Sequence, residues 1–122
     1  LTGTVSANTH FDPKTDLRST FERFTPENLA NNWPFVATLK AVADSKGATP
    51  SQIALAWLLA KKPWIVPIPG TRNINHLREN HGALELQFTA TELNEMDKVM
   101  SGLRVYGGRM NPAQMELVEP KV

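Results

Sequence analysis

The chain has 122 residues, of which 41% are hydrophobic and 20% are charged, a composition typical of one globular domain and not of a disordered segment. Its 13 basic and 12 acidic residues are interspersed and leave a formal net charge of +1, which argues against a dedicated nucleic-acid surface. There is no cysteine, which excludes disulfide and thiolate chemistry and favours a reducing, cytoplasmic compartment. No apolar run approaches the roughly 18 residues of a membrane span, and no signal peptide is visible.

The N-terminal half is expected to be a loop followed by helices. Residues 1 to 24 show no sustained periodicity and predict a long loop, which contains Arg18. Helices are expected over residues 25 to 62. The first begins at the N-cap Thr25 and contains Pro34, which should kink or break it.

A second helix and one strand follow. Thr49 and Gln52 have the spacing of a capping box, and the apolar residues 53 to 59 after them predict a helix that is buried on most sides. Pro63 closes this helix. Residues 64 to 68 are apolar, largely β-branched and of strand length, so they are the single strand that the sequence predicts.

The C-terminal part, residues 69 to 104, predicts a loop and two further helices. Gly82 should end the first of them, and a second capping box, Thr89 with Glu92, should begin the other. Residues 105 to 122 contain several glycines and prolines and predict an irregular tail.

The end of the predicted strand has the features of a phosphate site. Gly70 has no Cβ, so a ligand can approach the backbone closely. Thr71 offers a hydroxyl, and Arg72 offers a planar, permanently charged donor set. A helix N-terminus follows directly and adds oriented backbone N–H groups. Together these groups suit an anion.

Several blocks in this order resemble the C-terminal part of an aldo-keto reductase, specifically the bacterial, plant and channel-associated branch of that superfamily. The matching blocks are residues 47 to 59, 66 to 72, 79 to 80 and 93 to 97. The resemblance implies an α/β fold, a (β/α)8 TIM barrel that reduces carbonyl compounds with NADPH. Residues 64 to 68 would then be the last barrel strand. The first seven strands would precede Leu1, so residues 1 to 122 are expected to be the C-terminal fragment of one barrel domain.

The resemblance also implies roles for individual residues in binding NADP. Residues 1 to 24 would be a cofactor-side loop, in which Leu1, Thr2 and Gly3 run along the pyrophosphate and Arg18 folds over the cofactor. The loop after the strand would bind the adenosine 2′-phosphate, and Glu79 with Asn80 would hold the adenine. The cofactor-binding residues expected on this basis are Gly70, Thr71, Arg72, His76, Glu79, Asn80 and Arg18.

Some of these assignments have alternatives. His76 stands where many relatives carry Arg or Gln, and it is either a phosphate ligand or a surface residue. Arg72 could be a plain solvated residue, which is the role expected for Arg78. Glu79 and Asn80 could simply cap the end of a short helix. Trp57 is expected in the core.

The function expected from the resemblance is part of an NADPH-dependent oxidoreductase that reduces aldehydes or ketones to alcohols. The alternative is a non-enzymatic, nucleotide-binding regulatory or auxiliary subunit of the same fold. A self-standing helical interaction module is the third hypothesis. No catalytic residue is expected, because the family's Asp, Tyr, Lys and His tetrad would lie before Leu1 and the sole tyrosine, Tyr106, lies in the wrong place. The fragment alone should therefore be inactive. Its expected partners are a small carbonyl substrate and the missing N-terminal part of the barrel, with no metal, nucleic acid or membrane.

Overall fold

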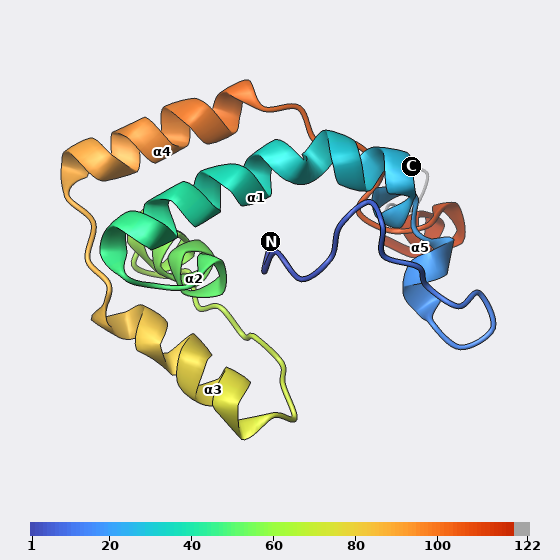
Figure 1. Ribbon diagram of the computed structural model, residues 1–122, viewed down its shortest axis with the longest axis horizontal. Coiled ribbons are helices and arrows are strands. Elements are labelled where there is room, and N and C mark those ends of the chain that lie inside the picture. Colours follow the sequence, from blue (N-terminus) through green and yellow to red (C-terminus); the bar gives the residue numbers. More distant parts are fainter. Residues whose placement is uncertain (119–122) are drawn as a thin grey trace. The chain divides into compact units, whose positions relative to one another are not determined.

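A computed structural model describes residues 1 to 118, and in this range it contains helices and connecting segments but no β-strand (Figure 1). The chain divides into two compact units. Unit 1 comprises Leu1–Thr4 and Pro34–Leu103, and unit 2 comprises Val5–Trp33 and Arg104–Val122. The α-helices are α1 (Pro26–Lys46), α2 (Pro50–Lys61), α3 (Ile74–His81), α4 (Ala90–Gly102) and α5 (Pro112–Val118), and short 3-10 helices occupy Leu17–Thr20, Glu22–Phe24 and Gly82–Glu85. None of the described helices is both long and apolar enough to cross a membrane.

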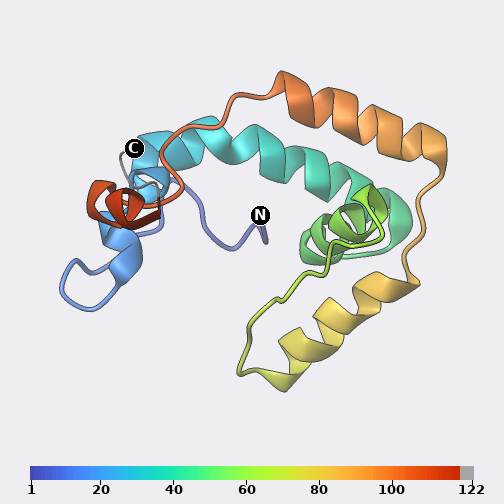
Figure 2. The same ribbon diagram turned by 180° about the vertical axis from the view of Figure 1, so that it is seen from behind.

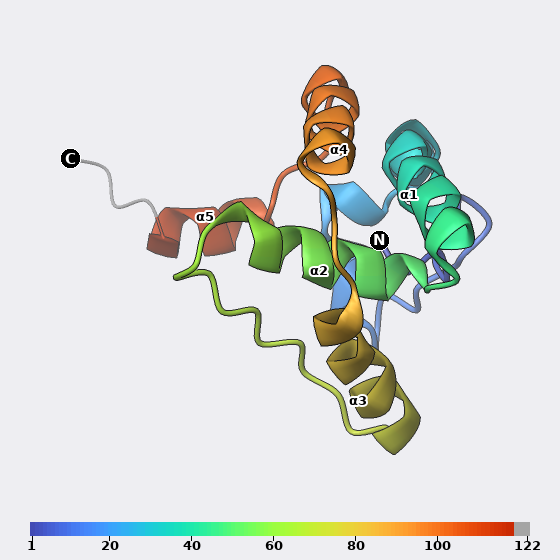
Figure 3. The same ribbon diagram turned by 90° about the vertical axis from the view of Figure 1, so that its left-hand side faces the viewer.

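The core of unit 1 lies where the second part of α1 packs with α2 and α4. Its buried members are Leu39 and Ala43 of α1, Ile53 of α2 and Met96 of α4, all at most 3% exposed. Figure 3 shows α1 and α4 end-on and side by side, with α2 crossing them. Val42, Phe88 and other half-buried residues extend this cluster outward: Ala48, Ala54, Trp57, Leu86 and Met100. Burial of these apolar side chains is what holds the three helices together.

Both predicted capping boxes are confirmed. At the start of α2 the Gln52 N–H donates to Thr49 Oγ1 at 3.3 Å, and the Thr49 N–H donates to Gln52 Oε1 at 3.0 Å. At the start of α4 the Glu92 N–H donates to Thr89 Oγ1 at 3.2 Å, and the Thr89 N–H donates to Glu92 Oε2 at 2.7 Å. Each box satisfies two backbone donors that have no partner within their own helix.

A lysine at the end of α1 connects that helix to α4. Lys46 Nζ lies 2.7 Å from Glu92 Oε1, donates to the Gln87 carbonyl at 3.0 Å and stands over the Phe88 ring at 5.1 Å. The Lys46 ammonium, followed by the Thr89 N–H, lowers the pKa of Glu92 from 4.5 to about 2. One carboxylate therefore serves both the cap of α4 and the junction with α1.

The prediction of a strand over residues 64 to 68 is wrong for this structure. The segment between α2 and α3 is a thin coil without regular structure (Figure 2), and Trp64, Val66 and Ile68 are 74%, 77% and 92% exposed. A strand exists only when a neighbouring backbone accepts and donates its hydrogen bonds, and none of the described residues supplies such a neighbour. Pro67 also lacks an N–H to donate.

The expectation that α2 is buried on most sides is also wrong here. Only Ile53 and Ala56 of this helix are buried, and Leu58 is 37% exposed. Helices α1 and α4 cover one face of α2, whereas the face that carries Leu55 and Leu59 lines an open hollow beside the extended segment. The apolar surface that the sequence assigned to a core is thus partly uncovered.

Unit 2 is held together by hydrogen bonds between its N-terminal and C-terminal segments. The Asn32 amide donates to the Tyr106 carbonyl at 2.8 Å and accepts from the Tyr106 N–H at 2.9 Å. Arg23 donates to the Gly107 carbonyl at 3.4 Å. The Phe24 ring makes edge contacts with the rings of Phe11 and Phe21, with centroids 5.4 and 6.3 Å apart. These contacts order segments that are distant in sequence.

Of the kink or break expected at Pro34, the break is wrong, because α1 is continuous over Pro26–Lys46, and a kink stays a prediction. A proline removes one backbone hydrogen bond from a helix; the Thr38 hydroxyl donates to the Pro34 carbonyl at 2.9 Å.

The tail of residues 105 to 122 is not wholly irregular, because it contains α5. Asn111 caps that helix by accepting from the Gln114 N–H at 2.9 Å, ahead of a first-turn proline. Residues 119 to 122 of the tail lie outside the described range.

We expect that the isolated, monomeric chain of 122 residues does not unfold cooperatively. Its fully buried apolar set comprises only Leu39, Ala43, Ile53, Ala56, Ala83 and Met96 among the described residues, while many large apolar side chains face water. Such a core provides little to offset the conformational entropy lost on folding. Differential scanning calorimetry of the verified monomer tests this, and a sharp two-state transition would contradict it.

Gly107→Ala should destabilise unit 2. Gly107 has φ +81°, which disfavours any residue with a Cβ, and that Cβ would lie 2.6 Å from the backbone N and Cα of Arg23. The strained backbone alone costs about 1 kcal/mol, and the clash with main-chain atoms adds to it. Gly102→Ala is the matched control, because nothing lies within 4 Å of its Cβ position. Denaturant unfolding of the full-length protein should separate the two, and equal midpoints would refute the prediction.

The carboxyl group of Glu92 should titrate near pH 2, as followed by its carbon-13 chemical shift in NMR spectra of the folded protein. Because the folded pKa lies below the ordinary value of 4.5, the contribution of Glu92 to stability is complete above pH 4.5 and is lost as the pH falls toward 2. Lys46→Met should raise this pKa, since the ammonium is its largest cause. An unchanged titration in the variant would show that the ion pair is not formed in solution.

Candidate functional site

Five of the predicted cofactor-binding residues line one cavity of about 430 Å³ in unit 1. They are Gly70, Thr71, His76, Glu79 and Asn80. The cavity is also lined by the opening residues Leu1, Thr2 and Thr4, by Ser51, Ala54 and Leu55 of α2, and by Pro69. The structure therefore brings together the two stretches, at the start of the chain and after residue 68, that the sequence assigned to one ligand.

The N-terminus of α3 opens beside this cavity, at the end that carries Thr71 and His76. Asn73 is the N-cap, and its side chain accepts from the Asn75 N–H at 2.9 Å. The Thr71 hydroxyl in turn accepts from the Asn73 N–H at 3.1 Å, which fixes the turn before the helix. Backbone N–H groups of a first helical turn have no acceptor within the helix, and the helix dipole makes this end partially positive. This end of the cavity therefore suits an anion.

Arg72 does not line the cavity wall, although both of its neighbours in sequence do. Its side chain is exposed and forms no ion pair within residues 1 to 118. A guanidinium one residue before the N-cap of α3, with no carboxylate on it, is a donor that an incoming phosphate could engage.

Arg18 lies in unit 2 and is engaged by a neighbouring carboxylate. Its Nε donates to Asp16 Oδ1 at 2.9 Å and its terminal nitrogen donates to Asp16 Oδ2 at 2.6 Å, while the guanidinium stands 4.5 Å from the Phe11 ring centroid. These hydrogen bonds from Arg18 lower the pKa of Asp16. Arg18 is thus held locally by Asp16, and its predicted contact with a cofactor stays a prediction.

Glu79 is held by the start of helix α2. Thr49 Oγ1 donates to Glu79 Oε1 at 2.7 Å, and Gln52 Nε2 donates to the Glu79 carbonyl at 3.0 Å. The Glu79 side chain is therefore bound across to α2, and the C-cap of α3 is the backbone of Gly82, whose N–H donates to the carbonyls of Arg78 and Asn80. The sequence indicates Thr49 and Gln52 only as a capping box, because nothing in residues 49 to 52 indicates a partner near residue 79.

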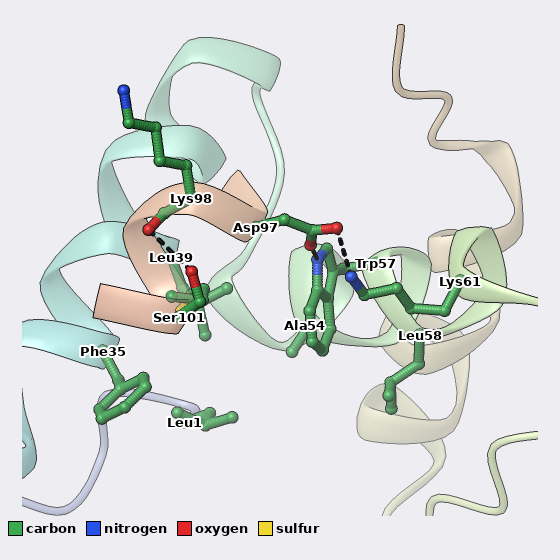
Figure 4. A pocket seen from close by; sticks show the side chains of 11 residues that line it. Leu1, Phe35, Leu39, Ala54, Trp57, Leu58, Lys61, Asp97, Lys98 and Ser101 are labelled. Atoms are coloured by element: carbon green, nitrogen blue, oxygen red, sulfur yellow. Dashed lines mark hydrogen bonds and ion pairs between the residues drawn. The ribbon is translucent and has the colours of Figure 1, made fainter. Parts of the chain in front are cut away.

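A second, larger cavity of about 730 Å³ adjoins the first and shares Leu1 and Ala54 with it (Figure 4). Its wall is mainly apolar and includes Phe35, Leu39, Leu58 and Met100. At one side the Trp57 indole N–H donates to Asp97 Oδ1 at 2.8 Å, and Lys61 forms an ion pair with the other carboxylate oxygen. Lys61, and then Trp57, lowers the pKa of Asp97.

This second cavity has the chemistry of a packing surface more than that of a nucleotide site. Its one carboxylate, Asp97, is neutralised by Lys61, and Trp57 also packs against the buried cluster of unit 1, as expected for a core residue. Across residues 1 to 118 no three or more His, Asp or Glu side chains are grouped so as to hold a metal ion.

Comparison with known proteins identifies what the chain resembles. The family model described as the Aldo/keto reductase family matches residues 1–101. The chain is 35% identical over 112 residues to aldo-keto reductase yakc of Schizosaccharomyces pombe, whose name specifies NADP(+), with 92% of this chain and 33% of that protein covered. It is 36% identical over 109 residues to aldo-keto reductase str7 of Strobilurus tenacellus, with 89% and 32% covered. The chain thus spans about a third of the length of these relatives.

Proposed function

The chain belongs to the aldo/keto reductase family, and on that premise we propose that it forms the adenosine end of the NADPH site in an oxidoreductase that reduces aldehydes or ketones to alcohols. The family implies a (β/α)8 barrel, in which phosphate sites commonly lie in the loops after the last strands. The observation that carries the proposal is the single cavity onto which Gly70, Thr71, His76, Glu79 and Asn80 converge.

The phosphate end of the site is proposed at the N-terminus of α3. Gly70 leaves the backbone open, Thr71 lines the cavity, and the first-turn N–H groups favour negative charge. Arg72, which has no carboxylate partner within the described residues, would form a bidentate contact with the adenosine 2′-phosphate. His76 would add a further hydrogen bond from its ring N–H.

The adenine end is proposed at the last turn of α3, where Glu79 and Asn80 lie half-buried on the same cavity. A carboxylate oxygen of Glu79 can accept from the exocyclic amino group of adenine, and the Asn80 amide can both donate and accept. This set of donors and acceptors fits a purine that carries an amino group. When NADPH is bound it supplies the hydride; the residues of this chain bind and orient its adenosine part.

The partner proposed for this chain is the remainder of the same barrel, together with a small carbonyl substrate. Residues 64 to 68 expose apolar side chains at Trp64, Val66 and Ile68, and they carry backbone groups that a neighbouring strand would satisfy. As the last barrel strand they would be covered on both faces. The same nucleotide cavity would serve the alternative, a non-enzymatic regulatory or auxiliary subunit, and the catalytic tetrad decides between the two.

Arg72→Ala in the full-length protein should weaken NADPH binding and leave NADH binding nearly unchanged. A charge-assisted contact of this kind is worth about 1.5 to 3 kcal/mol, or roughly ten- to a hundredfold in Kd. His76→Arg should strengthen NADPH binding, because a guanidinium carries a permanent charge and can donate two parallel hydrogen bonds to a phosphate. Fluorescence titration with both cofactors measures these effects.

Arg78→Ala is the matched control, because Arg78 is an exposed arginine in the second half of α3, away from the N-terminal end at which the phosphate is proposed. It should change neither dissociation constant appreciably. Equal losses of NADPH and NADH in Arg72→Ala would show that Arg72 supports the loop without reading the phosphate. Failure of the unmodified protein to bind either cofactor would overturn the proposed function itself.

A further inference from the structure

We propose that Thr49 and Gln52, the capping box of α2, are positioning residues that hold Glu79 in place for recognition of the adenine amino group. The inference rests on the proposed function, since it concerns the base end of that nucleotide site. Neither side chain lines the cavity itself. Their role is to fix the orientation of a carboxylate that lines the cavity.

The Thr49 hydroxyl makes two hydrogen bonds at once. It has one proton, which it donates to Glu79 Oε1 at 2.7 Å, and its lone pairs accept the Gln52 N–H at 3.3 Å. The cap of α2 and the orientation of Glu79 therefore depend on the same oxygen atom. A rotation of the Glu79 side chain would break this contact as well as moving the carboxylate in the cavity.

The Gln52 amide is oriented by both of its ends. Its oxygen accepts from the Thr49 N–H at 3.0 Å, so its NH2 group faces α3 and donates to the Glu79 carbonyl at 3.0 Å. The reverse orientation would place two donors together and two acceptors together. Gly82 leaves room for this contact, because a Cβ there would lie 2.5 Å from Gln52 Nε2. Side chain and backbone of Glu79 are thus both fixed from α2.

The second capping box of the chain shows that such a connection is not a general property of the motif. The Thr89 hydroxyl donates to Glu92 Oε2 at 3.1 Å, inside its own box, and Glu92 pairs with Lys46 on α1. Neither Thr89 nor Glu92 lines the nucleotide cavity. The chain therefore contains two boxes of the same kind, of which one is coupled to the candidate site and the other is an internal control.

The first experiment compares Thr49→Val, Thr49→Ser and Thr89→Val in the full-length protein. The probes are NADPH and reduced nicotinamide hypoxanthine dinucleotide phosphate, in which a carbonyl oxygen replaces the adenine amino group. Glu79 accepts from an amino group but repels a carbonyl, so the unmodified protein should prefer NADPH. Thr49→Val should reduce this preference roughly five- to tenfold, Thr49→Ser should restore it, and Thr89→Val should leave it unchanged.

The second experiment keeps the Thr49 hydroxyl and its contact with Glu79 and alters only the contact of the Gln52 amide with α3. Gln52→Glu retains an acceptor for the Thr49 N–H but places a carboxylate oxygen against the Glu79 carbonyl, which removes the donor. Gly82→Ala displaces the Gln52 amide by steric contact. Both variants should lower the preference for adenine over hypoxanthine, and they keep the proposal testable if Thr49→Val does not fold.

The affinity for NADH, compared with that for NADPH, distinguishes a positioning role from a merely structural one. Because NADPH and NADH share the adenine, the Thr49 and Gln52 variants should weaken both equally and leave the NADPH to NADH ratio, which Arg72 sets, unchanged. If the unmodified protein discriminates between the two bases and the variants discriminate equally well, the positioning role is refuted and the proposed function stands. If the unmodified protein does not bind NADPH, both fail.

Discussion

The hydrogen bonds between the start of α2 and the last turn of α3 are the contact on which the candidate site depends. Helix α3 has eight residues and no fully buried side chain, so it has little stability of its own. It is placed by Glu79, which accepts from Thr49 and Gln52, and by the short helix that follows at Gly82. Ile53 anchors α2 in the core of unit 1. The hydrogen bonds from the start of α2 therefore fix the position of α3, which is otherwise exposed.

The two ends of α3 then present different chemistry to one cavity. The N-terminal end, near Thr71 and His76, offers backbone donors and a partial positive charge, whereas Glu79 at the other end offers an acceptor. An eight-residue helix is about 12 Å long, so under the proposed function an anion and a purine amino group would be recognised at separate places on one element. A ligand that carries both groups at the right separation fits better than either alone.

Much of unit 1 could be predicted from the sequence because its signals are local. Capping boxes at Thr49 and Thr89 indicate where two helices begin, and these predictions are confirmed. The prediction of a strand over residues 64 to 68 failed because hydrogen bonding in a sheet is non-local. No described segment pairs with this one. Helix α5 had a local signal, Asn111 before a proline, which the glycine-rich surroundings obscured.

The residues of the candidate site also divide into those that are close together in sequence and those that only the tertiary fold brings together. Gly70, Thr71, His76, Glu79 and Asn80 could be grouped from sequence because they lie close together along the chain and the family resemblance assigns them to one cofactor. The supporting contacts from Thr49 and Gln52 could not, since they join segments separated by about thirty residues whose approach is decided by packing. The sequence thus indicates which groups line the cavity, while the contacts that hold Glu79 in a fixed direction arise only from the tertiary fold. Without the contacts from Thr49 and Gln52, α3 would therefore keep the same polar groups but lose their fixed orientation, and with it the preference for adenine.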